Sequence, residues 1–173
     1  WASADGKLLD NLKDPPTRAR MRAEMLQERT EWENLCQLAS PQGVLVLGLT
    51  KPENAQYAAK RLSEIATMMN KSWEDAAMDL LISERQRIGT VYFLMSEDNV
   101  KLNIAQPWMK FGTDAGGADP DSARSLTHPR SYGTYTRILG RYVRDEKVIP
   151  IEEAVRKSTS AVATRLSIPD RGV

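Results

Sequence analysis

Hydrophobic residues along the chain follow two patterns, short continuous runs and longer stripes at helical spacing. The continuous runs stand at 43–49, 90–95 and 109–113. Runs of this length are typical of strands that are buried on both faces of a parallel sheet. Between and after them, apolar residues recur every three or four positions. This alternation predicts an α/β fold with parallel strands.

The helical stripes predict helices at 14–38, 62–70, 72–89, 97–105, 135–144 and 151–166. Asp14 is expected to cap the first helix, whose outer face carries charges of both signs, and Ser72 with Asp75 resembles a capping box. Pro150 removes a side-chain cap from the last helix but presets the backbone of its first turn. Residues 1–13 show no clear period and are expected to be irregular.

Asp114 ends the third apolar run, and Gly116 and Gly117 follow closely. Glycine allows the chain to turn sharply at this point. An acid at the carboxyl end of a barrel strand faces the mouth of the barrel, where functional groups lie. Met109 and Phe111 are expected to shield this acid from water. The alternative is that Asp114 caps the next turn, because Asp is common in turns for its own hydrogen bonds.

A long, ordered series of motifs follows Asp114. It consists of HPR at 128–130, YGT at 132–134, an R-x-LGRYVR helix at 137–144 and a segment from EEAVRK to DRG at 152–172. This series resembles the D-aminoacylases, which are N-acyl-D-amino-acid deacylases of the metal-dependent amidohydrolase superfamily. The upstream segments IGTVYFLMSEDNV and QPWMKFGTDA fit the last barrel strands of the same family, whereas residues 1–40 match it only loosely.

The resemblance implies a helix-rich α/β fold, the C-terminal portion of a TIM-like (β/α)8 metal-dependent hydrolase barrel. Residues 1–173 would form one partial domain, with 1–42 as a helical lead-in and 43–173 as the last strands and helices. The implied function is that of a fragment of a zinc-dependent hydrolase that deacylates N-acyl-D-amino acids to a D-amino acid and a carboxylate. The alternative is a non-catalytic α/β interaction module that binds a partner through its charged first helix and keeps the motifs by descent.

The resemblance also implies roles for single residues. Asp114 would be the catalytic proton shuttle, which takes a proton from the attacking water and passes it to the departing amine. Arg130 would bind the substrate carboxylate, because a guanidinium can donate two parallel hydrogen bonds to it. A salt bridge from Arg130 to Asp119 or Asp121 is the alternative.

Gly116 and His128 would belong to the same substrate-binding loop, where His128 supports the loop rather than reacts. No G-x-G-x-x-G that opens a helix follows the glycines, so phosphate binding is not expected. In the resembled family, His and Cys residues on earlier strands hold the zinc. The chain contains one His and one Cys, His128 and Cys36. Zinc is therefore expected in the parent enzyme and not within this chain, which alone is expected to be inactive.

Composition narrows the expected partners. The 24 basic and 23 acidic residues leave a net charge of +1, which predicts no nucleic-acid partner. No apolar run approaches the ~20 residues of a membrane span, so no membrane partner is expected either. The expected partners are a small-molecule N-acyl amino acid and the missing N-terminal part of the barrel. The single cysteine suits a reducing compartment and predicts a cytoplasmic protein. Because the first residue is Trp1 rather than Met, the chain is expected to be cut from something longer.

Overall fold

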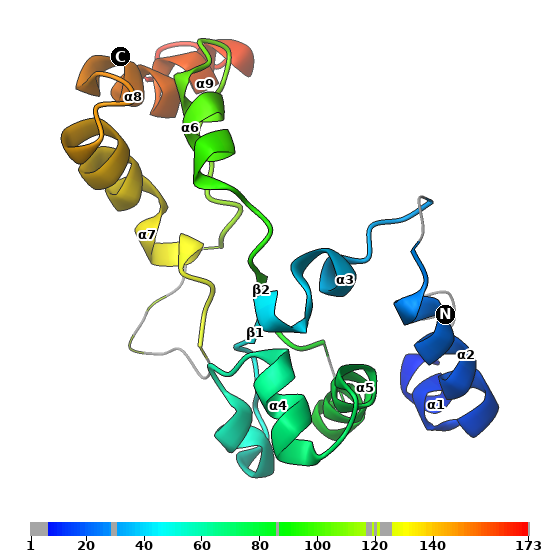
Figure 1. Cartoon of the computed structure of the whole chain (residues 1–173). Helices are drawn as coiled ribbons and strands as arrows, with labels where there is room; N and C mark the ends of the chain where they lie inside the picture. The colour runs from blue at the N-terminus through cyan, green and yellow to red at the C-terminus, as the bar shows by residue number, and fades with distance from the viewer. Residues whose placement is uncertain are drawn as a thin grey trace. The chain divides into compact units, whose positions relative to one another are not determined.

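The computed structural model describes residues 7–28, 31–85, 87–116, 119, 121 and 126–172, and it shows a helix-rich chain (Figure 1). The chain divides into two compact units. Unit 1 comprises Trp1–Leu94 with Asp121–His128, and unit 2 comprises Met95–Pro120 with Pro129–Val173. Each unit has its own clusters of buried hydrophobic residues.

Unit 1 consists of helices around a short two-stranded sheet. Helices α4 and α5 pack against each other, and α4 also contacts β1. The elements of the unit, in chain order, are α1 (Leu8–Lys13), α2 (Pro15–Leu26), α3 (Leu35–Ala39), the 3-10 helix η1 (Pro41–Gly43), β1 (Val44–Val46), the 3-10 helix η2 (Pro52–Tyr57), α4 (Leu62–Met69), α5 (Trp73–Glu84) and β2 (Thr90–Tyr92).

The two strands of unit 1 run antiparallel, so the prediction of parallel strands is wrong for this pair. Val44 lies opposite Tyr92, and Val46 lies opposite Thr90. A continuous apolar run indicates that a strand is buried, but it does not encode the direction of the neighbouring strand. Both strands are also shorter than the runs that predicted them, at 43–49 and 90–95.

Strand pairing ends at two glycines that cross closely. The N–H groups of Leu47 and Gly48 both donate to the carbonyl oxygen of Gly89, at 2.8 and 2.9 Å. A Cβ atom on Gly48 would lie 2.5 Å from the backbone nitrogen of Gly89, closer than real side chains allow. This position therefore requires glycine.

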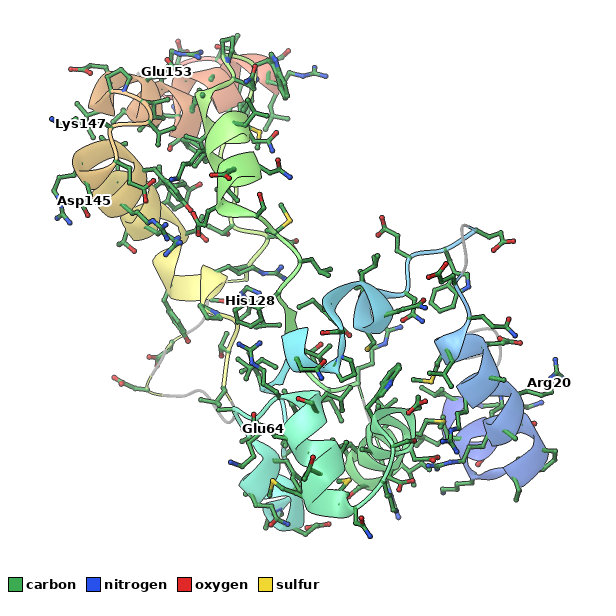
Figure 2. All side chains as sticks on the ribbon, viewed as in Figure 1. Arg20, Glu64, His128, Asp145, Lys147 and Glu153 are labelled. Atoms are coloured by element: carbon green, nitrogen blue, oxygen red, sulfur yellow. The ribbon has the colours of Figure 1, made fainter. Side chains whose placement is uncertain are left out.

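The core of unit 1 lies between the sheet and helices α4 and α5. The helix starts are fixed locally: Ser72 Oγ accepts the N–H of Asp75 at 3.3 Å, as predicted, and Glu64 Oε2 accepts the N–H of Arg61 at 2.7 Å (Figure 2). The buried residues form two adjoining clusters, Val44, Leu62, Ala66 and Ala76 in one and Val46, Leu49, Ile65 and Leu80 in the other.

Glu84, at the end of α5, is buried and holds the segment before η2. Its carboxylate accepts the N–H and the hydroxyl of Thr50 at 2.8 and 2.7 Å, the N–H of Lys51 at 3.2 Å and the amide of Asn54 at 2.7 Å. Burial opposes the charged form, but these hydrogen bonds outweigh it and hold the pKa of Glu84 below its ordinary value. Glu84 is thus a structural acid with all its partners inside unit 1.

The N-terminal region of unit 1 differs from prediction in two ways. Residues 8–13 form α1, because Leu12 is buried where α1 packs against α2 and α5. The long helix predicted at 14–38 ends at Leu26, although Asp14 caps its start as expected. Asn34 then starts α3: its side-chain oxygen accepts the N–H of Gln37 at 3.2 Å. This cap accounts for the start of α3 as a separate helix.

Unit 2 is helical throughout its described elements. Its core holds Ile104, Ile138, Tyr142, Ile149 and Ala154, against which Phe111 also packs. The elements are α6 (Glu97–Ala105), α7 (Arg130–Arg137), the π-helix η4 (Ile138–Asp145), α8 (Ile151–Ser158) and α9 (Ser160–Arg165).

Helix α6 is joined to η4 by a network around Glu97. Its carboxylate accepts the hydroxyl of Tyr142 at 2.9 Å and guanidinium groups of Arg137 at 2.7 Å and Arg141 at 3.2 Å. The hydrogen bond from Tyr142, followed by the two arginines, holds the pKa of Glu97 below its ordinary value. Arg141 continues the network to Glu146, at 2.6 Å. Arg137 and Arg141 of the R-x-LGRYVR motif therefore fix α7 and η4 to α6, whereas Arg144 pairs with the adjacent Asp145.

Helix α8 begins at Ile151 after Pro150 without a side-chain cap, as predicted. Its apolar spacing predicts a buried face of Ile151, Ala154, Val155, Val162 and Leu166, and this prediction is only partly right. Ala154 is buried, but Ile151 and Val155 are 47% and 50% exposed. The face that turns inward instead carries Ala154 and Lys157, because the Lys157 ammonium binds carbonyl oxygens at the end of α6.

Candidate functional site

The segment 106–116 of unit 2 carries Asp114, and it is not a strand, contrary to the prediction for 109–113. Phe111 packs against the unit 2 core, and its N–H donates to the carbonyl oxygen of Lys157 on α8 at 3.3 Å. A strand needs neighbouring strands for its backbone groups. The described backbone bonds of this segment go to a helix, from Phe111 to Lys157, and to a local turn, from Met109 to Gln106, so the apolar run forms an irregular connection here and not a strand.

Asp114 itself adopts a left-handed backbone conformation, with φ of 50°. A sharp bend thus falls on the acid itself, which tolerates this region better than most residues; Gly117, one of the glycines at which a bend was predicted, lies outside the described residues. The N–H of Ala115 donates to Thr113 Oγ1 at 3.2 Å, across the bend. The Asp114 side chain is 87% exposed, so the expected shielding from water by Met109 and Phe111 is not found. Its carboxylate points outward to solvent.

Arg130, the second predicted site residue, lies beside Asp114. The guanidinium Nη2 of Arg130, the first residue of α7, lies 3.0 Å from Asp114 Oδ2. The sequence alternatives for Arg130 were Asp119 and Asp121, and the structure shows an ion pair of Arg130 with a third acid, Asp114. Both side chains of the pair are well exposed, and an exposed ion pair contributes little to stability. The pair therefore leaves both groups accessible to a ligand.

A hollow of about 920 Å³ in unit 2 adjoins this pair. Its apolar wall includes Ile104, Met109 and Phe111, and its polar wall includes Arg130 and Arg137. Pockets that bind small molecules usually measure roughly 300–1,000 Å³ and combine an apolar lining with a few polar groups. The hollow thus has the size and lining of a small-molecule site, with Arg130 as one of its cations.

Of the other two predicted site residues, His128 belongs to unit 1, whereas Gly116, like the Asp114–Arg130 pair, belongs to unit 2. The side chain of His128, labelled in Figure 2, is partly buried. Around Gly116, a Cβ atom would have no neighbour within 4 Å, so no close approach of the backbone requires glycine there. The roles of His128 and Gly116 in substrate binding stay predictions.

The residues that the structure describes do not fit a zinc centre. No group of three or more His, Cys, Asp or Glu side chains within them is placed to hold a metal ion. The single cysteine, Cys36, is partly buried in unit 1, and burial raises the pKa of its thiol.

Lys157 is a residue of the site region that the sequence patterns missed. Its side chain is fully buried, while Ile151 and Val155, assigned to the core by their hydrophobicity, are exposed. One signal was present in the sequence: Lys157 follows Ala154 by three positions and so shares its helical face. A lysine on the inner face of a helix indicates a buried partner for its charge.

The chain is similar in sequence to known deacylases. No family model matches the chain. A D-aminoacylase of Alcaligenes xylosoxydans xylosoxydans is 34% identical over 117 residues, which are 68% of this chain and 22% of that protein. An N-acyl-D-glutamate deacylase of the same organism is 37% identical over 84 residues, 49% of this chain and 16% of that protein. The chain thus spans about a fifth of the curated relatives it matches.

Solved structures give the same result for the fold. N-acyl-D-glutamate deacylase from Bordetella bronchiseptica, solved with zinc and a phosphonate mimic of the tetrahedral intermediate, matches 80% of this chain and 27% of its own, with a TM-score of 0.63 and 29% identity. A D-aminoacylase described as defining a novel subset of amidohydrolases matches 76% of this chain and 26% of its own, with a TM-score of 0.59 and 32% identity. The predicted fold class, a helix-rich portion of a TIM-like amidohydrolase barrel, is confirmed. Within the described residues, no helix has the length and hydrophobicity to cross a membrane.

Proposed function

The chain is a relative of the D-aminoacylases in sequence and in fold, and we propose that it is the C-terminal part of the catalytic barrel of an N-acyl-D-amino-acid deacylase. The reaction would be hydrolysis of the N-acyl bond to give a D-amino acid and a carboxylate. Residues 1–173 would form one partial domain of that barrel. The observation that carries the proposal is the 3.0 Å pair of Asp114 and Arg130, which joins the two motifs with the most definite chemistry.

In this proposal Asp114 moves the proton of the reaction. An amine is a poor leaving group as an anion, so a carboxylate that takes a proton from the attacking water and gives it to the amine nitrogen accelerates the cleavage. The exposed carboxylate of Asp114 is accessible for this transfer, and the left-handed bend at residue 114 holds it outward from the core.

Arg130 binds the carboxylate of the substrate in this proposal. In the structure its guanidinium already binds a carboxylate, that of Asp114. A substrate carboxylate in the adjoining hollow would compete for the same donors, and its arrival would release Asp114 for proton transfer. His128 and Gly116 would complete the substrate-binding loop.

Zinc in the parent enzyme would be held by residues outside this chain, since the described residues do not fit the metal. The metal would supply activation of the attacking water. What the chain itself contributes is the proton carrier and the carboxylate anchor. A chain that supplies these two groups without metal ligands would be inactive alone.

The remaining part of the barrel would cover an apolar face of unit 2. Large side chains that the sequence pattern assigns to buried positions are exposed there, and surfaces of this kind mark interaction sites. The exposed large hydrophobic residues on α7, η4 and α8 include Tyr132, Tyr135, Leu139, Ile151 and Val155. An N-terminal barrel part packed on them would complete the core that the sequence predicts.

The alternative function, an interaction module that acts through its first charged helix, has less support. The basic side of α2 already faces acids inside unit 1: Arg18 Nη2 lies 2.9 Å from Asp75 and 2.7 Å from Asp79, and Arg22 lies 3.2 Å from Asp75. The hydrogen bond from Arg18 holds the pKa of Asp75 below its ordinary value. These charges fix α2 to α5.

A reducing, cytoplasmic location would suit the free thiol of Cys36.

The test is a deacylation assay on the complete protein that contains this chain. Purified protein is incubated with zinc and either N-acetyl-D-methionine or its L enantiomer, and release of the free amino acid is followed. We expect turnover of the D enantiomer and little turnover of the L enantiomer. A protein that hydrolyses neither enantiomer, or that binds a macromolecule through α2 instead, would support the interaction module.

A further inference from the structure

Lys157 is the only fully buried cation among the described residues, and its ammonium is directed at the start of the segment that carries Asp114. Its Nζ donates to the carbonyl oxygens of Ile104 and of Gln106, the latter at 2.6 Å. These two carbonyls lie at the C-terminal end of α6, where the last carbonyls of a helix have no partners within the helix. A buried cation there satisfies them and interacts favourably with the helix dipole.

Two further contacts join α8 to the same segment. The carbonyl oxygen of Lys157 accepts the N–H of Phe111 at 3.3 Å, and Arg156 Nη2 donates to the carbonyl oxygen of Pro107 at 3.1 Å. Glu153 holds Arg156 in place through two hydrogen bonds of 2.7 Å. We name the three residues of α8 that make these contacts the α8 clamp: Glu153, Arg156 and Lys157. Figure 2 labels Glu153.

The clamp acts on the backbone rather than on side chains. It fixes the segment at residues 104, 106, 107 and 111, and the chain then reaches Asp114 three residues later. Burial of Lys157 lowers the pKa of its ammonium, and the nearby carboxylate of Glu153, 3.8 Å away, opposes this effect. The buried ammonium is thus stabilised by carbonyl dipoles and one carboxylate. Burial of this charge without these partners would cost free energy.

We propose that Lys157 is a positioning residue for the deacylation reaction: its ammonium fixes the segment 106–113, and through it the carboxylate of Asp114. The inference rests on the proposed function, because it assigns the proton transfer to Asp114. Displacement of a catalytic group by about 1 Å can lower turnover on the order of 100-fold. Lys157 touches no substrate and acts on rate through Asp114.

The first experiment combines two substitutions in the complete, zinc-loaded enzyme. Lys157→Met keeps the aliphatic stem and removes the ammonium, and we expect kcat to fall on the order of 100-fold with KM changed less than about threefold. In an Asp114→Asn background, the same Lys157→Met substitution should cost less than about threefold, because the group that it positions is already gone. An equal loss in both backgrounds would show a general structural role and overturn the proposal.

Arg156→Met provides a variant that leaves the core intact, because this side chain is exposed; the substitution removes its bond to Pro107 and its two bonds to Glu153 on the same helix. We expect a loss of kcat of about threefold to tenfold, again without change in KM. Arg165→Met, an exposed arginine on α9, is the matched control and should leave kcat unchanged. Loss of turnover in the control equal to that of Arg156→Met would contradict a specific clamp.

A second measurement does not depend on the activity. Hydrogen exchange of the Phe111 amide reports its bond to the backbone carbonyl of residue 157. Loss of the ammonium in Lys157→Met should loosen the segment and make this exchange at least about tenfold faster, while α4 and α5 keep their protection. Unchanged exchange at Phe111 would overturn the clamp, whatever the enzyme does. Faster exchange in a protein that hydrolyses no N-acyl-D-amino acid would instead retain the clamp and contradict the proposed function.

Discussion

The guanidinium of Arg130 and the carboxylate of Asp114 lie 3.0 Å apart, and they are the residues to which the motif resemblance gives the two main roles. The guanidinium of Arg130 thus binds a carboxylate of its own chain in the structure. A substrate with its own carboxylate would take the place of Asp114 on Arg130. Recognition and proton transfer would then be coupled through one exchange of partners.

This exchange predicts the behaviour of Arg130→Lys. Lysine keeps the positive charge but loses the two-pronged geometry of the guanidinium, so KM for an N-acyl-D-amino acid should rise on the order of tenfold, more than kcat falls. Steady-state kinetics of the complete enzyme measure both constants.

The control for this variant is a substrate amide in which the carboxylate is replaced by a neutral carboxamide. On that substrate the parent enzyme and Arg130→Lys should behave alike, because the interaction that the substitution removes is never made. Equal losses on both substrates would mean that Arg130 only maintains the loop through its pair with Asp114.

Metal content gives a second prediction. The chain has one His and one Cys, whereas structural zinc sites use four nitrogen or sulfur ligands and catalytic sites use three protein ligands. The 173-residue chain, dialysed and analysed by plasma emission, should hold no stoichiometric zinc, while the complete enzyme keeps its metal. One tightly held zinc per 173-residue chain would contradict the assignment of the ligands to other parts of the protein.

Glu84 predicts a pH dependence of stability. Because the pKa of Glu84 is held below its ordinary value of 4.5 in the folded chain, its contribution is present above about pH 4.5 and is lost as the pH falls through the lower, folded pKa. At pH 7, Glu84→Gln should lower the free energy of unfolding by about 2 kcal/mol, since its amide group faces donors that need an acceptor.

Urea unfolding from pH 7 down through pH 4.5 measures this difference, and the gap between wild type and Glu84→Gln should narrow at the acid end. Glu53→Gln, an exposed acid on η2, is the control and should stay within about 0.5 kcal/mol of wild type. A gap of the same size at every pH would show that the charge of Glu84 contributes nothing.

Local signals in the sequence predicted the helix starts well. Ser72 and Asp14 cap the helices that they were expected to cap, and α8 begins directly after Pro150. Caps act through residues three positions away, so a sequence contains all the information they need. The family series from HPR to DRG likewise indicated the fold class, because its order is long enough to be specific.

Features that depend on distant neighbours could not be predicted in this way. The direction of β2 relative to β1 and the helix partner of Phe111 both follow from how separate segments meet. The burial of Lys157 in place of Ile151 follows from carbonyl groups at the end of α6, which no pattern within α8 reveals. The same holds for the Asp114–Arg130 pair, since the sequence offered nearer acids to Arg130.

The most direct test of the whole account is the turnover of Asp114→Asn in the complete enzyme, with N-acetyl-D-methionine as substrate. Asparagine keeps the shape of the side chain and cannot carry the proton, so kcat should fall on the order of 10²–10⁴-fold while the zinc content stays that of the parent. A kcat within about twofold of the parent, with zinc retained, would contradict the assignment of the proton transfer to Asp114.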